Sequence, residues 1–256
     1  PWDQRVARVF CTCFRNREDN RNPGGFLSSD CRGNLRRMLV DFTEKHDGLH
    51  LRLGTEPEMM WLKKGEDGLP DGGVSKPNAY HLDQFEILRP VFLRVIEYSQ
   101  AMGLDMIQGD HEDAPGQLEL NFMFDDALRT SDRLTTYRQI CAAVAREFDL
   151  IACFMAKPFM GLSANGCHHN LSLWRGGQDV VVNTAHAASK PGMEGVFTYQ
   201  KGGENIFLPD PLVDAKKPSP IGLNCIGGVI EHMGALTALG SSTVNSYRRL
   251  WDTGFW

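Results

Sequence analysis

Two glutamates separated by one proline stand in the mostly apolar stretch GTEPEMMWL, residues 54–62. The stretch predicts a strand, and side chains two residues apart leave the same face of a strand. Glu56 and Glu58 would therefore lie within reach of a single ion. A buried charge needs a partner, although a glutamate in a strand more often faces solvent, and the sequence leaves that simpler interpretation open.

A second pair of carboxylates brackets a predicted turn. Glu112 and Glu119 flank the turn DAPG, residues 113–116, which separates two stretches that predict strands. A hairpin would bring both carboxylates to one end of the sheet. Either glutamate, taken alone, is equally compatible with a solvated surface position.

One imidazole joins this set of acidic residues. In CHHNLSLW, residues 167–174, His168 shares a strand face with Asn170 and Ser172 by the period of two. His111 and His169 fit local hydrogen bonding or surface positions better than metal ligation. Carboxylate-rich clusters select the hard cations Mg²⁺ or Mn²⁺ rather than zinc, so the chemistry predicted here is the clamping of nucleotide phosphates by divalent ions.

The phosphate-binding pattern GxxxxGK[ST] is absent, so any ATP would be held by metals and sheet residues. Arg248 and Arg249 form a basic pair after a predicted helix. They fit a helix-exit charge pair, but a planar guanidinium also suits a two-pronged contact with a substrate carboxylate. The sequence does not decide between the two.

The elements that must position these residues alternate along the chain. Apolar periodicity and turn residues predict strands at 6–13, around Glu56, at 104–112, at 116–124 and at 150–159. Helices are predicted from about residue 30 to 46, 82 to 102, 131 to 148 and 225 to 239. Residues 62–80 read as a surface loop, and residues 175–220 as a long excursion with little core of its own.

Composition excludes several classes of protein. The chain has 256 residues, of which 42% are hydrophobic and 23% charged, which suits one large globular domain or a domain with a remnant of another. No apolar run is long enough for a membrane span. A net charge of −5 without a dense Lys/Arg block argues against nucleic acid as a partner. Seven scattered cysteines suit buried thiols in a reducing cytosol, so a cytoplasmic location is expected.

Four stretches, in this order along the chain, together resemble the glutamine synthetases. They are GTEPEMMW, GDHEDAPGQLELNF, FMAKPFMGLSANGCHHNLSLW and IGGVIEHMGALTALGSSTVNSYRRL. The stretch HEDAPGQLELNFMFDDALRTSDR is similar to the subgroup called type III in the rhizobial sense, which includes ligases that join glutamate to ammonia or to methylamine.

The resemblance implies an α+β fold, a curved antiparallel sheet backed by helices that forms half of a funnel completed by a neighbouring subunit in a homo-oligomeric ring. Residues 1–20 would end an amino-terminal small β domain, and residues 21–256 would form a catalytic domain truncated at its carboxy-terminal end. ATP and glutamate would enter opposite ends of the funnel. The implied product is a γ-glutamyl amide made through γ-glutamyl phosphate, with ammonia or a small amine as the second substrate.

The resemblance also implies roles for individual residues. Glu58, Glu112 and Glu119 resemble ligands of the Mg²⁺ or Mn²⁺ ion nearer glutamate, whereas Glu56 and His168 resemble ligands of the ion shared with the nucleotide phosphates. A non-catalytic relative should have lost some of these carboxylates, which are all present. The same motifs argue against a phosphagen-type kinase, which shares the general sheet.

The remaining roles concern the two substrates. Arg249 resembles the residue that grips the glutamate carboxylate, beside the loop that contains Ala164 and Gly166. The nucleotide contacts implied by the resemblance are Phe124, Asn170 and Ser172. Two of these positions depart from the family pattern, because Asn170 stands where a second histidine is common and Ala164 replaces a glycine.

Overall fold

The computed structural model describes residues 1–3, 5–15, 25–74, 79–184, 195–208 and 218–250. Its strands are β1 (His50–Lys64), β2 (Pro70–Gly73), β3 (Met106–His111), β4 (Gln117–Phe122), β5 (Asp125–Asp126), β6 (Leu150–Cys153), β7 (Cys167–Arg175), β8 (Gln178–Thr184), β9 (Gly195–Lys201) and β10 (Glu204–Asn205). Its helices are α1 (Cys31–Lys45), α2 (Leu82–Ala101), α3 (Ala127–Glu147), α4 (Pro220–Glu231), α5 (Met233–Gly240) and α6 (Val244–Arg248).

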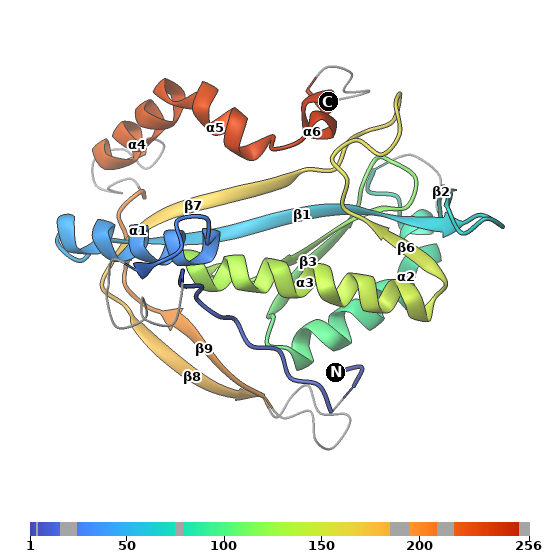
Figure 1. Ribbon diagram of the computed structural model, residues 1–256, viewed down its shortest axis with the longest axis horizontal. Helices are drawn as coiled ribbons and strands as arrows, with labels where there is room; N and C mark the ends of the chain where they lie inside the picture. The colour runs from blue at the N-terminus through green and yellow to red at the C-terminus, as the bar shows by residue number, and fades with distance from the viewer. Residues whose placement is uncertain (4, 16–24, 75–78, 185–194, 209–217, 251–256) are drawn as a thin grey trace.

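A long strand, β1, is the axis of the fold. The strands lie in the order β10-β7-β1-β4-β3, and β2, β5 and β6 also pair with β1. Every one of these pairings is antiparallel. The protein is therefore an α+β fold built on a curved antiparallel sheet, as expected from the sequence (Figure 1).

The two faces of β1 bury different groups, because its side chains alternate. Met59 and Trp61 belong to the main core, which α2 and α3 supply with Leu88, Val95, Tyr137, Ile140 and Val144. Met60 and Leu62 point the other way, into a small cluster with Ala114 and Cys153. Glu56 and Glu58 share the parity of Met60, so they leave the sheet on the face opposite the helices of the main core.

Helices lie on both sides of the sheet, but the helices on one side bury many side chains and those on the other side bury almost none. In Figure 1, α2 and α3 lie on one side of β1 and β7, and α4, α5 and α6 lie on the other. Gly222 is the buried residue of α4, and α5 and α6 bury none. Large apolar side chains of α4 and α5 are exposed among the described residues, namely Ile221, Leu223, Ile226, Val229, Ile230, Met233, Leu236 and Leu239.

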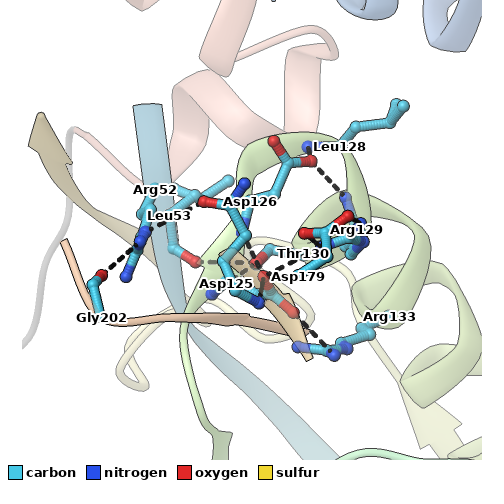
Figure 2. Close-up of polar contacts among 11 residues, drawn as sticks. Arg52, Leu53, Asp125, Asp126, Leu128, Arg129, Thr130, Arg133, Asp179 and Gly202 are labelled. Atoms are coloured by element: carbon cyan, nitrogen blue, oxygen red, sulfur yellow. Dashed lines mark hydrogen bonds and ion pairs between the residues drawn. The ribbon is translucent and has the colours of Figure 1, made fainter. Parts of the chain in front are cut away.

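The two-stranded sheet of β8 and β9 is joined to the rest of the fold by a buried ionic network (Figure 2). Asp125 is fully buried and pairs with Arg133 at 2.9 Å, with Arg129 3.7 Å away. Its Oδ1 also accepts the backbone N–H of Gln200 in β9 at 3.0 Å. Arg129 makes a two-pronged contact with Asp179 of β8, so the carboxylates of Asp125 and Asp179, with Arg129 between them, tie α3, β8 and β9 together.

The start of β1 contributes a second contact to this network. The guanidinium of Arg52 donates to the carbonyl oxygen of Gly202 at 2.8 Å and lies 4.0 Å above the ring of Trp174. Arg52 is itself buried, so its charge is compensated by these contacts and by the nearby carboxylate of Asp125. Thr130 of α3 donates to the carbonyl oxygen of Leu53 at 2.8 Å, which anchors the helix start to the strand.

Most of the expected elements are confirmed. The predicted hairpin is β3 and β4, and the predicted helices correspond to α1, α2 and α3, the last of which begins earlier, at Ala127. The terminal helix begins at Pro220, where Ser219 caps it, and His232 separates α4 from α5. The strand around Glu56 runs much further in both directions than its apolar stretch indicated.

Three expectations are wrong. Residues 6–13 form no strand, because Val6 and Val9 face solvent; among the described residues nearby, Phe14 and Phe26 form an isolated bridge. The strand at 150–159 is reduced to β6, of four residues. The loop at 62–80 contains the end of β1 and all of β2. The excursion at 175–220 contains β8, β9 and β10, which does not contradict the expectation of a segment with little core of its own, and residues 185–194 and 209–217 lie outside the described residues.

The cysteines follow the expectation only in part. All seven are free, but Cys141 and Cys153 alone are buried and the other five are exposed. No helix among the described residues is long and apolar enough to cross a membrane.

Candidate functional site

The register of the sheet places the sequence-predicted acidic residues on adjacent strands. Glu56 of β1 is paired with His168 of β7. Glu58 of β1 is paired with Glu119 of β4, and Glu119 is in turn paired with Asp110 of β3. Side chains directly opposite each other in an antiparallel pair lie side by side, so this pairing forms an acidic band across four strands.

The centre of the band has the geometry of a cation site. One ligand atom each from Glu56, Glu119 and His168 lie within 4.8 Å of one another. His168 Nδ1 is 3.2 Å from Glu56 Oε2 and 3.9 Å from Glu58 Oε1. Ligands on opposite sides of Mg²⁺ are about 4.2 Å apart, so these groups need little movement to surround one ion. A hard divalent cation therefore fits among the carboxylates of Glu56 and Glu119 and the imidazole of His168, with the carboxylate of Glu58 close by.

Glu112 is coupled to the same group by charge. Burial, followed by the neighbouring carboxylates Glu58 and Glu119, raises the pKa of Glu112 to about 7. Burial and nearby carboxylates also raise the pKa of Glu119. Asn121 donates a hydrogen bond to Glu119 at 2.7 Å, and this bond partly offsets the increase in pKa. Carboxylates gathered in this way repel one another, and a divalent cation would remove the repulsion.

Glu58 is held in one orientation from two sides. Its Oε2 accepts hydrogen bonds from Gln117 Nε2 and from the backbone N–H of Gly166, each at 2.9 Å. A Cβ atom at Gly166 would lie 2.6 Å from Glu58 Oε1 and 3.2 Å from Arg249 Nη2. A Cβ atom here would push the ends of these side chains aside, so Gly166 allows the carboxylate of Glu58 and the guanidinium of Arg249 to approach the same point.

A pocket of about 260 Å³ opens at this point. Its lining includes Glu58, Gly166 and Arg249, together with Arg138 and Ser246. A carboxylate and two guanidinium groups around one cavity suit a small zwitterion, in which an acidic group faces arginine and an amino group faces glutamate.

The loop before β7 is hydrogen-bonded to the hairpin of β3 and β4 beside the site. Gln117 Nε2 also donates to the carbonyl oxygen of Ala164 and to Asn165 Oδ1, each at 3.0 Å. Ser163 donates to the carboxylate of Asp113, which lies in the turn between β3 and β4. Ala164 therefore contributes its carbonyl oxygen, and a glycine at this position could accept the same hydrogen bond.

Gln117 and Asn165 lie at the candidate site but are not among the residues expected from the sequence. Both are buried and both connect the hairpin turn to the loop before β7. Gln117 lies two residues before Glu119, on the same face of β4, and this spacing was the available signal.

Asn170 lies beside the predicted cation site, on the same strand as His168. Its Nδ2 donates to Glu56 Oε1 at 2.8 Å, while His168 approaches the other oxygen of the same carboxylate. Asn170 thus fixes the orientation of Glu56.

An aromatic surface lies beside the acidic band, toward the start of β1. Phe124 stacks against Trp174 with ring centres 6.0 Å apart, and Trp174 Nε1 donates to Ser172 Oγ at 2.8 Å. A Cβ atom at Gly54 would lie 3.5 Å from the Cβ of Phe124, whereas Trp174 is paired with His50, so the aromatic pair extends along β1 from Gly54 toward His50. Phe124 remains 39% exposed, which leaves part of its ring available to a ligand.

Comparison with known families matches nearly the whole chain. The family model described as "Glutamine synthetase, catalytic domain" matches residues 28–194 and 197–256. Glutamine synthetase of Pyrococcus furiosus is 32% identical over 253 residues, which are 98% of this chain and 47% of that protein. Glutamine synthetase of Rhizobium meliloti is 29% identical over 252 residues, 98% of this chain and 50% of that protein. The chain spans about half the length of these curated relatives.

Solved structures agree with the fold. The structure of GmaS without ligand superposes with a TM-score of 0.70 at 29% identity, covering 90% of this chain and 48% of that one. Glutamine synthetase of Plasmodium falciparum gives a TM-score of 0.67 at 22% identity, which supports the fold alone.

Proposed function

Because the chain belongs to the glutamine synthetase family, we propose that it forms the substrate-binding half of an ATP-dependent ligase that joins the γ-carboxylate of glutamate to ammonia. The chain covers about half of its relatives, so the activity is proposed for the whole protein.

The order of three features along β1 carries this proposal. Phe124 of the aromatic pair lies over Gly54, Glu56 belongs to the acidic band, and Glu58 lines the pocket that also contains Arg249. Four residues of strand span about 14 Å. A nucleotide base at the aromatic end and an amino acid at the pocket end would bring a phosphate chain and a carboxylate together over the acidic band.

The acidic band would hold the divalent cations that this family requires. Glu56, Glu119 and His168 supply one set of ligand atoms, with Glu58 and Glu112 at its edge. A bound Mg²⁺ or Mn²⁺ would neutralise charge on the transferring phosphoryl group.

The residues of this chain position the reactants. Arg249 would make the two-pronged contact with the α-carboxylate of glutamate, which leaves the γ-carboxylate directed toward β1. An oxygen of that carboxylate attacks the terminal phosphorus of ATP, ADP leaves, and γ-glutamyl phosphate forms. The nitrogen of ammonia then attacks the carbonyl carbon of the γ-glutamyl phosphate, inorganic phosphate leaves, a proton is lost, and glutamine results.

Other features of the protein follow from the same proposal. Residues 21–256 would belong to the catalytic domain and residues 1–20 to the end of a small β domain. The protein would assemble into a homo-oligomeric ring in the cytoplasm, with small-molecule substrates and neither nucleic acid nor a membrane as partner. A match that begins at residue 28 supports the domain assignment.

Phosphate release by the full-length protein tests the proposal. With ATP, Mg²⁺ and glutamate, we expect release to depend on an added amine, with ammonia preferred over methylamine at equal concentration of the free base. The second amine is included because the stretch from His111 to Arg133 resembles the subgroup that contains methylamine ligases. No glutamate-dependent release with either amine would contradict the proposal, and a preference for methylamine would correct its substrate.

A further inference from the structure

The helix that carries Arg249 has little packing to hold it. α6 buries no residue, and Val244 and Tyr247 are exposed. The preceding helix, α5, buries none either. Burial of apolar side chains is the usual source of helix stability in proteins, and an isolated helix of five residues has almost no intrinsic stability. Within the described residues, hydrogen bonds rather than apolar burial hold α6 against the rest of the fold.

A side-chain amide in α6 makes two of these hydrogen bonds. Asn245 Oδ1 accepts the backbone N–H of Lys157 at 2.8 Å, and Asn245 Nδ2 donates to the carbonyl oxygen of Lys157 at 2.8 Å. The amide thus satisfies both backbone groups of one residue, as a neighbouring strand would. Lys157 lies in the loop between β6 and β7, beside which α6 is seen in Figure 1.

This loop is rigid enough to serve as an anchor. Lys157 is buried, and its Nζ donates to the carbonyl oxygen of Leu162 at 2.5 Å. Asn165 closes the loop on itself, with its backbone N–H bonded to Ala156 O and its side chain to Met155 O, each at 2.8 Å. The next residue, Gly166, donates to Glu58. Asn245 is therefore linked to the acidic band through hydrogen bonds of a single loop.

We propose that Asn245 is a positioning residue that holds Arg249 at the pocket for the substrate carboxylate. The inference rests on the proposed function, in which Arg249 grips glutamate. Arg249 lies four residues after Asn245, about one helical turn, so a shift of α6 relative to Lys157 moves the guanidinium by a similar amount. A displacement of about 1 Å at a substrate-positioning group is enough to impair an enzyme severely.

Two substitutions and one control test the proposal in the full-length protein. Asn245→Ala removes the amide, and Asn245→Leu removes both hydrogen bonds while keeping most of the volume. We expect each to raise the KM for glutamate about tenfold or more and to change the KM for ATP less than twofold. Val244→Ala, at a neighbouring position that is 75% exposed, should leave both constants within twofold of the wild type.

Hydrogen exchange separates this inference from the proposed function. The backbone amides of residues 243–250 should exchange at least tenfold faster in Asn245→Leu than in Val244→Ala, whether or not the protein proves to be a ligase. A wild type without glutamate-dependent turnover, together with this faster exchange, would contradict the assigned reaction and preserve the anchoring. An active wild type whose Asn245 variants keep the parental KM for glutamate, or unchanged exchange in α6, would overturn the positioning role.

Discussion

Substitution of the buried Asp125 tests how much its ion pairs contribute to the free energy of unfolding. Asp125→Asn keeps the shape of the side chain and removes its charge. Removing one partner of a fully buried ion pair costs about 3–5 kcal/mol, because the other charge remains uncompensated. The side chains of the partner arginines, Arg133 and Arg129, are 16% and 30% exposed, and Asp179 continues to pair with Arg129. We therefore expect a loss at or slightly below the lower limit of this range, about 2–3 kcal/mol.

Asp179→Asn is the matched control, since it removes a carboxylate from the same network (Figure 2). The side chain of Asp179 is 50% exposed, and exposed ion pairs contribute about 0–1 kcal/mol. The two variants have the same net charge and the same chemistry of substitution, so their difference reports the burial of Asp125 together with its additional partners.

Denaturant unfolding followed by circular dichroism measures both variants. The midpoint should fall clearly for Asp125→Asn and barely for Asp179→Asn, with equal slopes in denaturant, because the surface exposed on unfolding is unchanged. An Asp125→Asn variant within about 0.5 kcal/mol of the wild type would refute the reasoning, as would an equal loss in both variants.

Three further predictions concern the site. Glu58→Gln should abolish metal-dependent phosphate release with little change in the unfolding midpoint; unchanged release at limiting Mg²⁺ would remove Glu58 from the site. Arg249→Lys should raise the KM for glutamate about tenfold or more, because an ammonium cannot make the two-pronged contact; a parental KM would contradict its role. The pKa of Glu112 near 7 means that its carboxyl group is protonated below that pH, so Mn²⁺ affinity should fall from pH 8 to pH 6; a flat profile in calorimetric titrations would exclude Glu112.

Periodicity in the sequence was sufficient to predict the faces of the sheet that matter for the site. Glu56 and Glu58 do leave one face of β1, and the turn at 113–116 does join two antiparallel strands. These are local properties, because a period of two and a turn motif depend on a few neighbouring residues. The convergence of β1, β4 and β7 required pairing between distant segments, and only the ordered motifs pointed to it.

Other features depend on partners that local patterns do not reveal. Asp125 and Asp126 are adjacent and chemically identical, yet one is fully buried in an ionic network and the other caps α3. Asn245 bonds to Lys157, 88 residues earlier, and nothing in the surrounding sequence marks it. The stretch at 6–13 shows the opposite error, since its apolar residues match a strand that finds no partner in the described part of the chain.

Direct binding of Mn²⁺ tests the central claim, that carboxylates and an imidazole from separate strands form one cation site. Titration of the full-length protein followed by electron paramagnetic resonance should show loss of the free Mn²⁺ signal. Glu56→Gln and Glu119→Gln should each weaken binding by tenfold or more, whereas Glu66→Gln, in an exposed turn, should not. Equal affinity in all four proteins would contradict the claim.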